Sequence, residues 1–172
     1  MALLDFLNVV TIFWLTLGAS VLHVLEEYFG GFVEMMRRYG PLRGITKGVF
    51  LLVNAVFIVL CLLAAIINAA VPVYSLSVAA LIFINSLIHI GGAARAKGYA
   101  AGLGSALFLY IPLSIYAYIL YSQAGLLDPV ILLLSLLLGA AWMGLAVGYG
   151  LAVGRLAKPS KVRQRGQDLP TR

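Results

Sequence analysis

The stretch LGASVLHVLEEYFGG, residues 17–31, closes an apolar run that begins at Leu3 and is long enough to span a bilayer. His23, Glu26 and Glu27 are ionisable, and such side chains are costly in hydrocarbon unless they are buried against partners, a cavity or an ion. Because an α-helix turns once every 3.6 residues, His23 and Glu27 share one face and Glu26 lies beside them. The stretch therefore predicts a membrane helix that carries polar chemistry.

The composition of the whole chain predicts an integral membrane protein. Of its 172 residues, 63% are hydrophobic and only 10% are charged, whereas soluble domains carry about 25% charged residues. The single cysteine, Cys61, excludes an intramolecular disulfide and a thiolate metal cage. Any metal would therefore need imidazole and carboxylate ligands.

Five apolar segments are each long enough to cross the ~30 Å hydrocarbon core of a bilayer. They cover residues 4–29, 47–70, 73–94, 100–122 and 129–154. Backbone polar groups in lipid must be satisfied within the segment, so each is expected to be a helix, with a kink at Pro112 in the fourth. We expect an all-α polytopic bundle of five transmembrane helices over residues 1–154. The basic tail, residues 155–172, is expected to stay disordered against anionic lipid.

The positions of the basic residues predict the orientation of the chain. All twelve Lys and Arg residues follow the first, third or fifth apolar segment. Under the positive-inside rule, this pattern puts the N-terminus outside and the C-terminus in the cytoplasm, for a protein of the cytoplasmic membrane or an equivalent one. The rule accounts for the whole basic excess, so binding of nucleic acid is not expected.

Polar side chains of three segments fall at similar depths below the cytoplasmic surface. At 1.5 Å per residue, His23 and His89 lie about 9 Å inside, Asn54 about 10 Å and Asn85 about 15 Å. A single polar residue in a membrane helix more often makes a helix–helix hydrogen bond than binds a ligand. Their common layer nevertheless favours one site. Its candidate catalytic residues are His23, Glu26, Glu27, Asn85 and His89, with Asn54 in support.

The residue types in this layer match two kinds of chemistry. Two imidazoles and a carboxylate are a ligand set of zinc and of non-haem iron. A mononuclear metal site would use His23, His89 and one of Glu26 or Glu27, with Glu27 on the same face as His23. The other carboxylate would then be the general base. Without a metal, a His–Glu pair could move a proton on a lipid-like substrate.

Three functions remain open on this evidence. The leading hypothesis is a small membrane-embedded enzyme that acts on a lipid-like substrate. The second is a non-catalytic subunit whose polar layer fixes helix packing. The third is a transporter or sensor of protons or cations, which is less favoured because the outer parts of the second and third segments are nearly all apolar.

Two blocks of sequence resemble one family. The string HVLEE is the first, and Asn85–His89, the turn Gly98–Gly102 and Leu109–Pro112 form the second. In this order they are similar to the HXXEE-domain membrane proteins, over roughly residues 15–120. Ala101 stands where a proline is expected. The resemblance implies that the five candidate residues act together, but it implies no particular reaction. Tyr99 of the turn is a further supporting candidate.

The fifth segment carries a stripe of small residues at every fourth position. The stripe comprises Ala140, Gly144, Gly148 and Ala152. Such stripes let helix backbones approach closely. Packing inside the bundle is favoured, and a homodimer through Ala140, Gly144 and Gly148 is the alternative.

Residues 31–44, between the first two segments, mix apolar and charged side chains and predict a short interfacial helix. This helix would either cover the polar layer or anchor the chain to the membrane surface. Anchoring is favoured.

Overall fold

The computed structural model describes residues 3–38 and 44–156 of the chain, and these form helices and turns without a strand. The helices are α1 (Leu3–Phe29), α2 (Phe32–Arg38), α3 (Lys47–Ile67), η1 (Asn68–Ala70), α4 (Pro72–Ala96), α5 (Leu103–Ser105), the π-helical turn η2 (Ala106–Tyr110), α6 (Ile111–Gln123) and α7 (Pro129–Leu156). Most of the basic tail, and residues 39–43 of the segment after α1, lie outside the described residues.

The prediction of five long apolar helices is confirmed. Among the described residues, five stretches are long and apolar enough to cross a membrane. They cover Asn8–Phe29, Lys47–Ala70, Pro72–Ala96, Leu103–Gln123 and Pro129–Val153. Polar residues at the helix starts satisfy backbone groups that the helices leave free. The hydroxyl of Thr46 accepts from the Val49 amide at the start of α3, and the Asp128 carboxylate accepts from two amides at the start of α7.

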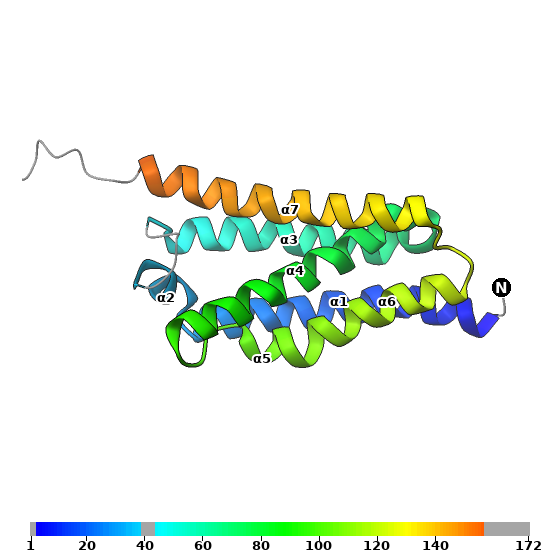
Figure 1. Cartoon of the computed structure of the whole chain (residues 1–172), viewed down its shortest axis with the longest axis horizontal. Coiled ribbons are helices and arrows are strands. Elements are labelled where there is room, and N and C mark those ends of the chain that lie inside the picture. Colours follow the sequence, from blue (N-terminus) through cyan, green and yellow to red (C-terminus); the bar gives the residue numbers. More distant parts are fainter. Residues whose placement is uncertain (1–2, 39–43, 157–172) are drawn as a thin grey trace, which may run out of the picture.

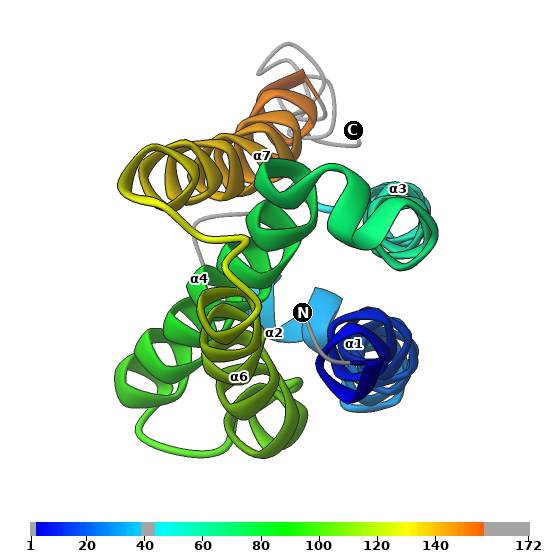
Figure 2. The ribbon, with the colours of Figure 1, turned by 90° about the vertical axis from the view of Figure 1, so that its right-hand side faces the viewer.

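Four spans surround the interior, and the fifth lies outside them. Figure 1 shows α4 crossing the bundle obliquely between α3 and α6, and Figure 2 shows α7 against α4 and away from α1 and α6. An apolar core joins α1, α3, α4 and α6 in the half of the bundle away from α2, around residues such as Phe13, Leu76 and Tyr121. The polar layer with His23 and His89 lies in the half of the bundle next to α2. We call this half the α2 end.

The fourth span changes its helical geometry just before its proline. The Ile111 amide donates to the Ala106 carbonyl five residues back, which makes one π-helical turn. Pro112 follows directly and has no N–H to donate, so the regular pattern of hydrogen bonds is interrupted there. The irregularity expected at Pro112 is therefore present as a wide turn.

The small-residue stripe does not pack inside the bundle, so the interpretation favoured from the sequence is wrong. A Cβ atom added to Gly144 or Gly148 would meet nothing within 4 Å, and Ala140 is exposed. The close approach to α4 is instead made by Gly139, where an added Cβ would lie 2.6 Å from the Ala80 Cβ. The homodimer through the exposed stripe stays a prediction.

The end of the bundle away from α2 is also less apolar than its sequence indicates. Asn68 is buried there, where its amide nitrogen donates to the Val10 carbonyl at 2.9 Å. Its amide oxygen accepts from the Tyr121 hydroxyl at 2.9 Å. These bonds tie η1 to α1 and α6 and satisfy both ends of the Asn68 amide.

Candidate functional site

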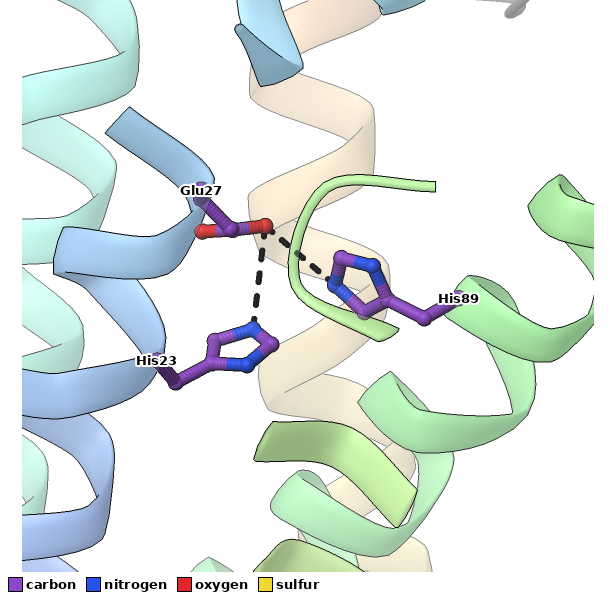
Figure 3. Close-up of side chains that lie close together, drawn as sticks. All are labelled: His23, Glu27 and His89. Atoms are coloured by element: carbon purple, nitrogen blue, oxygen red, sulfur yellow. Dashed lines mark ion pairs between the residues drawn. The ribbon is translucent and has the colours of Figure 1, made fainter. Parts of the chain in front are cut away.

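Three buried side chains from two helices meet at the α2 end. His23 and Glu27 lie one turn apart on α1, and His89 faces them from α4, as Figure 3 shows. Their exposed fractions are 1%, 5% and 3%. The sequence places both histidines at one depth, and in the structure their ring centroids are 4.8 Å apart.

The geometry of these three residues is that of a candidate metal site. The Glu27 Oε1 lies 3.2 Å from the His89 Nε2 and 3.7 Å from the His23 Nε2. One ligand-type atom from each residue can be chosen so that all three lie within 4.8 Å of one another. Two imidazole nitrogens and one carboxylate oxygen form a ligand set suited to zinc or iron, with positions left open for water or substrate.

Gly102 closes the site from the loop that follows α4. Its φ is +89°, a left-handed conformation that glycine adopts without strain. A Cβ atom added there would lie 2.5 Å from the His89 Cε1, 2.9 Å from the His23 Cε1 and 3.0 Å from the Glu27 Cγ. The three side chains therefore depend on the absence of a side chain at residue 102.

Glu26 has its own partners although it adjoins Glu27 in sequence. Successive side chains of a helix point about 100° apart, and Glu26 faces the start of the fourth span. Its carboxylate accepts from the Gly104 amide at 2.9 Å and the Ser105 amide at 2.8 Å. The hydroxyls of Ser105 and Tyr99 also donate to it. The hydrogen bond to Glu26 raises the pKa of Tyr99, so this phenol keeps the proton that it donates.

A chain of hydrogen bonds runs from Asn85 through His23 to Glu26. The Asn85 Nδ2 lies 2.9 Å from the His23 Nε2, and the His23 Nδ1 lies 2.8 Å from the Ser105 Oγ. An ionised carboxylate only accepts, so Ser105 gives its one proton to Glu26 and accepts from the His23 Nδ1–H. This direction leaves the His23 Nε2 with its lone pair, on the side of Glu27 and His89.

The structure thus brings together the five candidate residues and Tyr99, but not Asn54. The Asn54 amide donates to the Phe50 carbonyl one turn back on α3, and within the described residues no hydrogen bond or ion pair joins it to the cluster. Sequence reasoning assigned no role to Ser105 or Gly102. Gly102 ends the turn Gly98–Gly102 that the sequence singles out, and Ser105 follows it by three residues, so position was the available signal.

Helix α2 packs beside the site, against the start of α3. Its Val33 and Met36 are buried against Ile45 and Phe50, and the Phe32 ring centroid lies 5.8 Å from that of His89. The sequence predicts this short helix correctly but favours a membrane anchor. In the structure its Phe32 ring lies beside the His89 ring, and the choice between a cover for the cluster and a membrane anchor stays a prediction. Residues 39–43 of the segment lie outside the described chain.

Comparison with known proteins gives one match. A family described as "Protein of unknown function with HXXEE motif" matches residues 14–117, which include the second half of α1, the whole of α4 and the whole cluster. No curated protein and no solved structure matches the chain.

Proposed function

The chain belongs to the HXXEE family of proteins of unknown function, and we propose that it is a membrane-embedded metalloenzyme. In this proposal His23, Glu27 and His89 hold one zinc or iron ion, and the substrate is lipid-like. The observation that carries it is the meeting of two imidazoles and one carboxylate, all buried, within 4.8 Å inside two apolar spans.

The cost of burying these groups supports a bound cation. A carboxylate in an apolar interior loses the solvation of water, and a nearby positive charge is the usual compensation. The ion-pair partners of Glu27 in the structure are the two imidazoles, which carry a positive charge only when they are protonated. A divalent ion between the three residues would replace those protons and compensate the carboxylate directly.

The surrounding residues would orient this ligand set. When bound, the ion supplies Lewis-acid chemistry, which polarises a carbonyl or phosphoryl oxygen. Ser105 holds the Nδ1–H of His23 and so keeps its Nε2 unprotonated, while Glu26 fixes Ser105. Four donors already occupy Glu26, which favours an orienting role for it over the general base expected from the sequence. The Asn85 amide, 2.9 Å from the same Nε2, would turn its oxygen toward the ion or the substrate.

We further propose that the α2 end faces the cytoplasm, with the N-terminus outside. Arg37, Arg95 and Lys97 lie near this end, at the ends of α2 and α4. The span ends at the opposite side of the bundle, around residues 67–74 and 122–130, carry no basic residue. Basic residues are retained on the cytoplasmic side during insertion. A cysteine-accessibility assay on single cysteines placed at residues 71 and 97 of a Cys61→Ser protein tests this orientation.

The enzymatic proposal is tested by following lipid turnover. The purified protein is reconstituted in vesicles of a mixed extract that contains phospholipids, free fatty acids and isoprenoid alcohols, and lipids are compared by mass spectrometry over time. We expect a product whose formation needs added zinc or iron. In Glu27→Gln the rate of product formation should fall by more than about 100-fold, because the amide lacks the negative charge of the carboxylate ligand. A product formed equally by the variant, or no metal-dependent product, would contradict the proposal.

One observation favours a second candidate, a non-catalytic subunit. Both ring nitrogens of His23 already have side-chain partners, and Glu27 is already paired with His89. A network satisfied in this way can fix helix packing without any chemistry. For such a subunit, Glu27→Gln would lower the apparent melting temperature in detergent and leave every lipid species unchanged.

Loss of the Ser105 hydroxyl is expected to weaken metal binding without removing a ligand. In Ser105→Ala the His23 Nδ1–H loses its partner, and substitutions of such orienting groups typically cost 10–100-fold in metal affinity. Competition titration with a chromogenic chelator measures the change. Ser86→Ala is the matched control, because the buried Ser86 hydroxyl bonds only the backbone carbonyls of Ile82 and Ala106. Equal affinity of the two variants would contradict the orienting role.

A further inference from the structure

An apolar groove of about 440 Å³ lies on the membrane-facing side of the bundle, between α1 and the π-helical turn with α6. Trp14, Gly18 and Leu22 form one wall, and Phe108 and Pro112 form the other. No charged side chain lines it. Its volume falls in the range of 300–1,000 Å³ that is usual for small-molecule sites.

A glycine on one wall and an irregular backbone on the other make room for this groove. Gly18 has no side chain, and a Cβ atom added there would meet nothing within 4 Å. Opposite it, the π-helical turn Ala106–Tyr110 and Pro112 widen the backbone of the fourth span. Both walls belong to membrane spans, and Trp14 and Phe108 are 49% and 78% exposed. The medium that meets the groove is therefore hydrocarbon.

The groove lies close to the candidate metal site, separated from it by one layer of side chains. Ala19 lines it and packs against Tyr110, whose ring centroid is 4.4 Å from that of His23. Toward the α2 end, the next turn of α1 after Leu22 carries Glu26, which bonds the Gly104 amide. The groove thus runs along apolar residues, and Glu26 lies one helical turn beyond its last α1 residue, Leu22.

We propose that this groove binds one acyl chain of the substrate, with the polar end of that molecule next to Glu26 and Tyr99. An occupant of this site must be apolar along the groove, because every side chain of the lining is apolar. It should be polar at the end toward α2, because the half-buried Glu26 and the exposed Tyr99 lie just beyond Leu22 on that side. A single-chain or phospholipid amphiphile meets both requirements. Naming it as the substrate rests on the proposed function, whereas binding of the chain rests on the groove alone.

A pair of glycine substitutions tests the proposal. Gly18→Leu fills the groove with a side chain that meets no atom at its Cβ, whereas Gly144→Leu adds the same side chain to α7, where the Cβ also meets nothing within 4 Å. The probe is a phospholipid with a diazirine in one acyl chain, at low mole fraction in vesicles. Labelled peptides are identified by mass spectrometry.

We expect labelling of the peptides that contain residues 14–22 and 108–113 to fall at least about fivefold in Gly18→Leu and to stay unchanged in Gly144→Leu. Equal labelling in Gly18→Leu and wild type would overturn the proposal. So would labelling of α7 as strong as that of the groove, since that is the pattern of bulk lipid.

Metal content measured on the same samples keeps the two proposals separate. Gly18→Leu should retain the metal of the wild-type protein, because Gly18 lies outside the ligand set. If the wild-type protein binds no metal but labelling still falls in Gly18→Leu, the result would support the groove and contradict the metalloenzyme. If the wild-type protein and Gly18→Leu both bind metal and their labelling is equal, the result would support the metalloenzyme and contradict the groove.

Discussion

Replacing both His23 and His89 by alanine is expected to reduce bound metal from about one ion per chain to less than about a tenth of that. The substitution removes both nitrogen ligands and leaves the Glu27 carboxylate alone, and one carboxylate does not retain zinc or iron through purification. The change leaves the apolar core at the other end of the bundle intact, because His23 and His89 take no part in it.

The measurement is inductively coupled plasma mass spectrometry on protein purified in detergent without chelators. Asn54→Ala is the control, since it removes a polar side chain from a membrane span but not from the cluster. It should keep its metal. Equal metal in the double variant and in wild type would show that the ion binds elsewhere.

Gly102→Ala is expected to disorganise the site while the five spans persist. The left-handed backbone at φ +89° costs an alanine about 1–2 kcal/mol. In addition, the new Cβ would lie 2.5 Å from the His89 Cε1, which is too close for any real contact. The ring is the part that can move, so His89 should swing away from Glu27. We expect metal affinity to fall by more than about 100-fold, beyond the 10–100-fold of an orienting residue.

Gly125→Ala separates the two causes of this effect. Gly125 also has a positive φ, +68°, but a Cβ added there would meet nothing within 4 Å. The control therefore carries a comparable backbone strain without contact with the site. Both variants should melt at lower temperature than wild type, and only Gly102→Ala should lose metal in a chelator titration. Normal metal affinity in Gly102→Ala would mean that the site does not need the close approach of this loop.

The five spans could be predicted from the sequence because each is one long apolar run. A backbone in hydrocarbon has few alternatives to a helix, so length and composition suffice. The boundaries agree within a few residues, as for the third span, predicted over 73–94 and observed over Pro72–Ala96. What composition does not determine is the face on which each helix packs.

The fifth span illustrates this limit. Small residues allow close approach, but several of them face different directions on one helix. The sequence drew attention to Gly144 and Gly148, which are exposed, while Gly139 makes the contact with α4. Nothing in the period of four distinguishes these faces, because the distinction depends on the residues of α4.

The candidate site was predictable where its residues share a helix or a depth. His23 and Glu27 are four residues apart, and His89 follows from counting residues to the end of its span. Ser105 and Gly102 could not be found in this way, because they act through a turn whose backbone conformation brings them to α1. The different roles of Glu26 and Glu27 could be assigned only from the structure, because each role depends on the residues that the side chain faces.

X-ray absorption spectroscopy of the zinc-loaded protein tests the central claim most directly, because it reads the ligands of the ion itself. The account predicts a first shell with two imidazole nitrogens at about 2.0–2.1 Å from the zinc and at least one oxygen. The outer-shell scattering of two histidine rings should accompany it. It also predicts that the His23→Ala/His89→Ala protein does not give this spectrum. A shell of oxygen alone, or the same spectrum from both proteins, would contradict a metal centre at His23, Glu27 and His89.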